Sequence, residues 1–176
     1  MQLTPAMQRF ILHWGEMGSR WGVNRSVAQV HALLFLSAKP LPADEIAETL
    51  SIARSNVSGA IRELQGWKLV QVSRELGDRR DHFTTLHDMF DLVRVVVEGR
   101  REREFLPTLQ ALEDVYSEAE ADGQTPEPVR RRLREMADTM RLFDGWYAEV
   151  ARLPRSLQVA LLKAGGSLRR ILPRQE

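Results

Sequence analysis

One predicted helix combines small, hydroxyl, amide and guanidinium side chains in a short stretch, ARSNVSGAIREL at residues 53–64. Val57, Ile61 and Leu64 fall at i, i+4 and i+7, which predicts a helix over residues 54–67 with these side chains buried. The polar positions of this helix are Arg54, Ser55, Asn56, Ser58 and Arg62. Small side chains let a helix approach base edges in a DNA major groove, and the polar groups can hydrogen-bond bases or phosphates. A solvated helix face without a partner is the alternative.

A second group of arginines surrounds a predicted turn. The sequence SRELGDRRDHF places Arg74, Arg79 and Arg80 between two short segments whose pattern predicts a β-hairpin. An arginine at a hairpin tip can enter the DNA minor groove, where the potential is most negative at narrow A·T steps, so we expect the wing at residues 76–81 to contact the minor groove. Asp78 and Asp81 are placed to orient the guanidinium groups by paired hydrogen bonds. A charged turn that only confers solubility is the alternative.

The overall charge of the chain gives this interpretation little support. The formal net charge is +1, so any basic surface must be local. Six basic and four acidic residues lie between residues 51 and 82, so the argument depends on their arrangement rather than on their excess.

Composition also limits the other classes of function. The chain has no cysteine, which excludes disulfides and thiolate metal sites. There is no cysteine nucleophile and no placed serine–histidine–acid constellation, so we expect neither an enzyme nor a bound cofactor. The N-terminus lacks a signal pattern, and no apolar run is long enough to span a bilayer. We therefore expect a cytoplasmic protein with no membrane partner.

The surrounding pattern predicts a mainly α protein that begins with a winged helix-turn-helix. Three further helices are predicted before the polar helix, at residues 5–20, 27–37 and 43–50. Three helices followed by a β-hairpin is the order of a winged helix-turn-helix: a three-helix core with the hairpin as its wing. We expect this DNA-binding domain, with its N-terminal helix, to occupy residues 1–87.

Residues 88–176 are predicted to form a helical dimerisation region. Asp88 is expected to cap a long helix that runs to about residue 121 and is interrupted at Pro107. Thr125 is expected to cap the next helix, which is followed by a last helix from residue 154 to 162 that ends at Gly165-Gly166 and by a basic tail.

The helix after Thr125 carries apolar residues at alternating spacings of four and three. They are Val129, Leu133, Met136, Met140, Phe143 and Tyr147. This heptad pattern predicts either packing within one helical hairpin or a dimer interface. A symmetric DNA site needs a two-fold protein, which favours the dimer interface.

The sequence resembles a known family over residues 8–105. Gly18 and Trp21-Gly22, the turn at residues 34–41 and the polar helix at residues 58–64 are similar to the GbsR-type branch of the MarR superfamily. The resemblance implies a homodimer that binds pseudo-palindromic double-stranded DNA, usually as a repressor. Some relatives sense choline- or betaine-like compounds, so a small-molecule effector is a further expectation. A winged-helix adaptor that binds protein instead of DNA is the alternative.

One position departs from the family pattern. Ala53 stands where the family usually has serine or threonine before the recognition helix, and loss of such a cap typically costs about 1 kcal/mol. Ser55 is expected to satisfy some of the free N–H groups instead.

Two weaker groups of residues have simpler explanations. A metal site would use His82, His87, Asp88 and Asp91, but a helix cap at Asp88 and a strand position for His82 are the simpler interpretation. An aromatic cage for a quaternary ammonium group would draw on Trp14, Trp21, Trp67, Trp146 and Tyr147, although aromatic residues at helical spacing are more often core residues.

Overall fold

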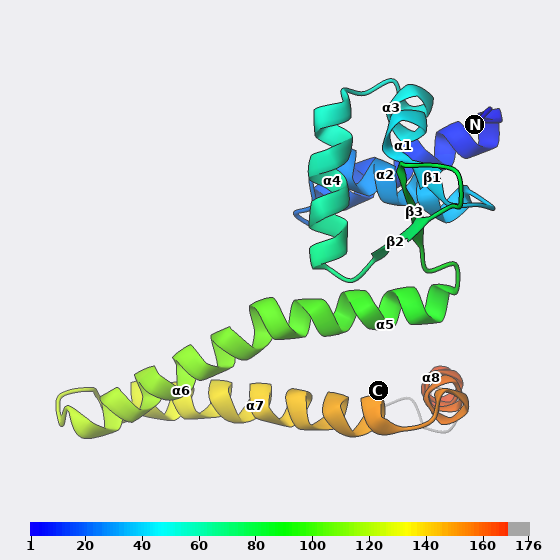
Figure 1. Cartoon of the computed structure of the whole chain (residues 1–176). Coiled ribbons are helices and arrows are strands. Elements are labelled where there is room, and N and C mark those ends of the chain that lie inside the picture. The colour runs from blue at the N-terminus through cyan, green and yellow to red at the C-terminus, as the bar shows by residue number, and fades with distance from the viewer. Residues whose placement is uncertain (169–176) are drawn as a thin grey trace. The chain divides into compact units, whose positions relative to one another are not determined.

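The computed structural model describes residues 1–168, which fall into two compact units that divide between Glu102 and Arg103. The first unit contains α1 (Pro5–Arg20), α2 (Arg25–Leu36), β1 (Leu41–Pro42), α3 (Ala43–Leu50), α4 (Arg54–Gly66), β2 (Val70–Arg74), β3 (Asp81–Thr85) and α5 (Met89–Arg100) (Figure 1). This is a winged helix-turn-helix, as predicted, with α3 and α4 as the helix-turn-helix.

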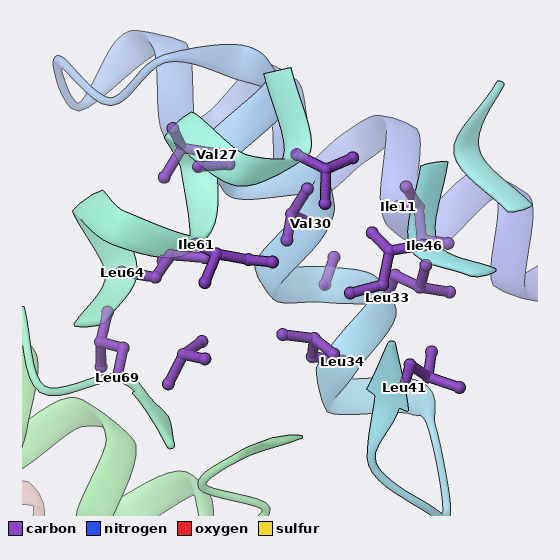
Figure 2. Close-up of a cluster of buried hydrophobic side chains, with 14 of the residues drawn as sticks. Ile11, Val27, Val30, Leu33, Leu34, Leu41, Ile46, Ile61, Leu64 and Leu69 are labelled. Carbon is purple, nitrogen blue, oxygen red and sulfur yellow. The ribbon is translucent and has the colours of Figure 1, made fainter. Parts of the chain in front are cut away.

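The core of the first unit is built around α2. Val30 and Leu33 of α2 are completely buried, and Ile61 and Leu64 of α4 lie in the same cluster (Figure 2). Each fully buried aliphatic side chain of this kind stabilises the fold by roughly 1.5–3 kcal/mol. The apolar positions of α4 are therefore buried as its spacing predicts, and its polar positions are left outside the core.

The first unit extends further along the chain than the domain expected at residues 1–87. Leu92 of α5 is buried in the same core cluster, and Val95 and Val96 pack against that cluster. Asp88 begins α5 as expected, because its side chain accepts hydrogen bonds from the backbone N–H groups of Phe90 and Asp91.

Helices α1 and α2 approach closely at a glycine. A Cβ atom added to Gly18 would lie 2.5 Å from the Cβ of Ala28, a distance that real Cβ atoms do not adopt. Gly22, with φ +78°, makes the turn that follows α1, and the Asn24 side chain caps α2 by accepting from the Ser26 N–H. The segment from Gly18 to Gly22 is therefore where the two helices are held together.

Gly18→Ala should lower the free energy of unfolding by about 1–3 kcal/mol, because the added methyl group overpacks the α1–α2 crossing. The sign of this change in the free energy of unfolding is diagnostic, since a substitution of glycine by alanine normally stabilises a helix by up to about 1 kcal/mol. Gly145→Ala is the matched control, because a Cβ there meets nothing within 4 Å. Urea denaturation of both variants measures the difference. A stabilised Gly18→Ala variant would contradict the close crossing.

The wing is part of a three-stranded antiparallel sheet in the order β1-β3-β2. Strands β2 and β3 pair from Val70↔Thr85 to Arg74↔Asp81, so residues 75–80 form the connecting loop. This loop is longer than the tight turn that the sequence suggested. Strand β1, only two residues long and containing Pro42, pairs with the other edge of β3 and was not predicted.

The second unit is a helical hairpin. Its elements are α6 (Leu106–Ala121), α7 (Glu127–Arg152) and α8 (Arg155–Leu168), and a π-helical segment, η1 (Arg101–Phe105), spans the boundary between the units. Segment η1 ends two residues before Pro107, where the missing N–H and the ring prevent a regular α-helical turn. The predicted interruption at Pro107 is confirmed in this form.

Helices α6 and α7 pack against each other antiparallel. Ala137 of α7 is fully buried in their contact. Two ion pairs join the helices: Arg141 to Glu113 at 2.6 Å and Arg134 to Glu120 at 3.2 Å. As the residue number rises on α7, the number of its partner on α6 falls, which is the order of an antiparallel pair.

Two expected helix ends in this unit are wrong. Thr125 does not cap α7, because its hydroxyl donates to the Asp122 carboxylate and α7 begins after Pro126 without a side-chain cap. Helix α8 continues through Gly165 and Gly166 to Leu168, so the two glycines do not end it. Residues 169–176 of the predicted basic tail lie outside the described residues.

Candidate nucleic-acid interface

The outer face of α4 presents polar side chains without partners. Arg54, Ser55, Asn56 and Arg62 are exposed, and Ser58 is half-buried. Within residues 1–168, none of these five side chains makes a hydrogen bond or an ion pair. Polar groups that the fold leaves unused keep their full hydrogen-bonding capacity for a ligand. The structure therefore places the five predicted contact residues of this helix on one accessible element.

The start of α4 is uncapped. Ala53 is the N-cap residue, and no side chain accepts a hydrogen bond from the first turn, so the expectation that Ser55 would do so is wrong. The N–H groups of Asn56 and Val57 both bond to the Ala53 carbonyl. The preceding N–H groups of Arg54 and Ser55 have no acceptor in the described part of the chain. Free N–H groups at the positive end of a helix favour an anion such as a phosphate.

The three arginines of the wing differ in their surroundings. The Arg74 Nε donates to the Asp81 Oδ1 at 3.0 Å, across the last pair of the hairpin. Arg80 donates from Nε and Nη2 to both carboxylate oxygens of Asp78. Arg79 is exposed and has no partner among residues 1–168. The expected pairing of aspartates with arginines is therefore present for Arg74 and Arg80.

Arg80 also donates from Nη1 to the Oδ2 of Asp44 at 2.9 Å, a contact that sequence reasoning missed. Hydrogen bonding to the Arg80 guanidinium lowers the pKa of Asp78 to about 2 and also lowers the pKa of Asp44. Both carboxylates are thus ionised near neutral pH and hold a single guanidinium between them. No local signal could have linked residues this far apart in the sequence.

Buried polar groups fix the base of the wing. The Thr85 hydroxyl donates to the Leu69 carbonyl at 2.7 Å, which joins β3 to the residue before β2. His82 is only 5% exposed, with Nδ1 3.2 Å from the Arg80 carbonyl and Nε2 3.5 Å from the Asp78 carboxylate. His87 also has a structural partner, because its Nε2 lies 3.0 Å from the Ser37 carbonyl oxygen. Across residues 1–168, no three histidine or acidic side chains are grouped as metal ligands would be.

The heptad residues of α7 divide into two sets. Leu133, Met140 and Tyr147 are half-buried on the side that carries the fully buried Ala137. The other set is exposed: Val129 by 42%, Met136 by 52% and Phe143 by 62%. Leu142 and Trp146 are exposed beside them, and the heptad pattern did not include these two. We call the exposed set, with Leu142 and Trp146, the α7 apolar stripe.

The aromatic residues considered for a cage lie in different surroundings. Trp14 stacks on Phe10, with ring centroids 5.4 Å apart, and its ring centroid lies 6.2 Å from that of His31. Trp21 is largely exposed, and its carbonyl oxygen accepts a hydrogen bond from the Arg100 guanidinium. Trp14 therefore acts as a packing residue between α1 and α2.

Comparisons with known proteins agree with this fold. The sequence pattern of the MarR family matches residues 21–81, which include α2, the helix-turn-helix and most of the wing. A solved structure described as a transcriptional regulator, 22% identical, covers 82% of this chain and 95% of its own chain with a TM-score of 0.57. That likeness establishes the shared fold.

Two further solved structures have lower TM-scores. A Staphylococcus aureus MepR variant bound to an oligodeoxyribonucleotide is 18% identical, with a TM-score of 0.39 over 82% of this chain and 99% of its own. YusO from Bacillus subtilis is 23% identical, with a TM-score of 0.38 over 66% of this chain and 86% of its own. No curated protein sequence matches the chain. None of the helices in residues 1–168 is long and apolar enough to cross a membrane.

Proposed function

We propose that this protein is a sequence-specific regulator of transcription that binds double-stranded DNA as a homodimer, of the GbsR-type branch of the MarR superfamily. It would act as a cytoplasmic repressor, by binding and without a chemical step. The observation that carries the proposal is the outer face of α4, where four exposed polar side chains have no partner in the described residues. The GbsR-type resemblance further implies an effector of choline or betaine type, which would change operator affinity when added.

In this proposal α4 lies in the major groove. The Asn56 amide has the geometry to pair with adenine, and Arg62 can donate two hydrogen bonds to guanine. The free N–H groups of Arg54 and Ser55 would receive a backbone phosphate at the start of the helix. The missing cap at Ala53 would then leave the Ser55 donor open, since a capping oxygen at residue 53 accepts from the second or third N–H of the helix.

The wing loop at residues 75–80 would lie against the minor groove. Arg79 supplies an unpaired cation for the narrow groove, and Arg80 supplies the N–H donors that its carboxylate partners leave free. Arg74, at the end of β2, would contact the adjacent phosphate backbone.

The second unit would supply the two-fold axis. The α7 apolar stripe is a contiguous set of large apolar side chains on one helix, and a second copy of the same stripe would cover it. Val129, Met136 and Phe143 belong to the stripe and would meet their counterparts directly. Leu133, Met140 and Tyr147, the half-buried set, would instead hold α7 against α6.

A protein-binding adaptor with the same fold is the competing function, and salt dependence separates the two. Selection of the preferred duplex from a random pool gives a cognate site for the purified protein. A regulator that covers about six phosphates should lose roughly 1,000-fold in affinity between 50 and 200 mM salt. Failure to select any duplex, or an affinity that is independent of salt, would contradict the proposal.

Arg62→Ala should weaken binding to the selected duplex by roughly 10-fold or more and relax specificity at one base pair, because a bidentate base contact is lost. Arg9→Ala is the matched control, since Arg9 of α1 is also exposed and has no partner within residues 1–168. Fluorescence anisotropy with labelled duplexes measures both variants. Equal losses for the two variants would show only a general effect of charge.

Gly59→Ala should raise the free energy of unfolding by about 0.5–1 kcal/mol and still weaken binding to the selected duplex. Gly59 lies within α4, and a Cβ there would meet nothing within 4 Å, so the fold itself does not need this glycine. The added methyl group would hinder close approach to base edges. Thermal unfolding and duplex binding are measured on the same sample, and unchanged binding would contradict a close contact at this position.

A further inference from the structure

The wing loop runs from Glu75 to Arg80 and turns at Gly77, which has φ +89°. Its tip has few local constraints, whereas Asp78 and Arg80 are joined by hydrogen bonds within the loop. One backbone hydrogen bond, from the Asp78 N–H to the Glu75 carbonyl, closes the turn. Leu76 at its tip is fully exposed. A surface loop of this kind is mobile unless contacts from outside the loop hold it.

One such contact continues the register of the sheet. Leu41 pairs with Phe83 and Pro42 pairs with His82 in the β1–β3 ladder. Two residues further along each chain segment stand Asp44 and Arg80, at the point where β1 has become α3. Their side chains meet at 2.9 Å, so an ion pair extends the ladder beyond its last backbone pair.

The guanidinium group is divided between the two elements. Nε and Nη2 bond to Asp78 within the loop, and Nη1 bonds to Asp44 on α3. The backbone N–H of Arg80 also donates to Asp78, at 2.9 Å, which fixes the residue that carries the guanidinium. The planar guanidinium holds its N–H donors in a rigid fork that suits bonding in both directions at once; a lysine ammonium has three donors but no such fork.

The ion pair between Asp44 and Arg80 matters more for the position of the wing than for the stability of the fold. Arg80 and Asp44 are both about half exposed, and exposed ion pairs add little to the stability of a fold. Asp44 also places a negative charge beside a surface that would approach phosphates, which by itself disfavours DNA. Asp44 also lies in the first turn of α3, where its carboxylate accepts the Glu45 N–H at 3.1 Å and modestly stabilises the helix, so the contact with Arg80 is the feature that remains to be explained.

We propose that Asp44 is a positioning residue that holds the wing against the helix-turn-helix through Arg80, so that the wing and α4 reach DNA as one rigid surface. The inference rests on the proposed DNA-binding function. It assigns to α3 a role in wing placement, in addition to its packing against α4.

Asp44→Asn removes the charge of Asp44, and the two explanations predict opposite changes in DNA affinity for this variant. If Asp44 acts only by repelling phosphates, Asp44→Asn should bind all duplexes more tightly. If it positions the wing, Asp44→Asn should lose about 5- to 10-fold in affinity for the selected duplex, with a smaller change on a random duplex. Glu48→Gln is the matched control, because it removes one charge from α3 where no contact to the wing exists in the described residues.

A second measurement follows the wing without DNA. The chain has no cysteine, so Leu76→Cys provides a single site for a nitroxide spin label at the tip of the wing. The spectrum should sharpen when Asp44→Asn is added and stay unchanged with Glu48→Gln. The melting temperature of Asp44→Asn should stay within about 3 °C of the parent protein.

The outcomes separate the two proposals. Equal or tighter binding of the selected duplex by Asp44→Asn, with an unchanged spectrum, would overturn the role of Asp44 and leave DNA binding intact. A parent protein that selects no duplex would overturn the proposed function, and the spin-label spectra would still decide whether Asp44 restrains the wing.

Discussion

Lysine at both Met136 and Phe143 should convert the proposed dimer into monomers, raising its dissociation constant at least 100-fold. Both side chains belong to the α7 apolar stripe and are more than half exposed in the single chain. In a dimer through this stripe they would be buried, and two lysines would place unpaired charges in the contact. Sedimentation equilibrium measures the change, and affinity for a two-half-site operator should fall with it.

The control for this double variant is Asp138→Lys with Gly145→Lys. These positions are also seven residues apart on α7 and exposed, but each lies two residues, and therefore about 200° around the helix, from Met136 or Phe143. That pair should remain dimeric. Circular dichroism should show the same helix content in both double variants. A Met136, Phe143 variant that still sediments as a dimer would place the interface elsewhere.

The division of the heptad residues shows where sequence periodicity loses information. Spacings of four and three mark one broad apolar side of α7, and they cannot tell which partner covers which part. Met140 and Phe143 looked equivalent in the sequence, but Met140 is half-buried and Phe143 is exposed. Substitution of Met140 would therefore disturb the hairpin itself.

The winged helix-turn-helix was predictable because its signals are local. Three buried positions on α4 follow from a spacing within one helix. The acidic residues in the first turn of α3 and the cap at Asp88 are signals that extend over only a few residues of sequence. The wing itself was placed correctly by its alternating strands, although the length of its loop was not.

The features that the sequence did not reveal are long-range. The contact of Asp44 with Arg80 joins residues 36 positions apart, and strand β1 exists only because β3 offers an edge to Leu41 and Pro42. Thr125 illustrates a different limit. Its hydroxyl donates to the Asp122 carboxylate and does not accept from the N–H groups of the helix that it was expected to cap, so a local partner decided the outcome.

Acidification from pH 7 should destabilise the first unit through His31 by about 3 kcal/mol. His31 is only 5% exposed, and burial lowers its pKa from 6.5 to about 4. The unfolded chain therefore binds a proton between these pH values that the folded chain does not bind. The stabilising contribution is complete above pH 6.5 and is lost as the pH falls from 6.5 toward 4.

His31→Leu should remove this part of the pH dependence. The Nε2 of His31 is buried and has no hydrogen-bond partner in the described residues, so an apolar side chain gives up no polar contact there. At pH 5 the free energy of unfolding of the variant should equal or exceed that of the parent protein. At pH 8 the difference between the two proteins should be smaller. Urea denaturation between pH 4.5 and 8 gives both curves.

His13→Gln is the control, because it removes one histidine from the exposed side of α1 and leaves His31 in place. The comparison isolates one group, since every other titrating residue is common to the proteins compared. If His31→Leu kept the full acid sensitivity, the loss of stability would have to come from groups other than His31. A flat profile for His31→Leu alone would assign the acid sensitivity to the α1–α2 core.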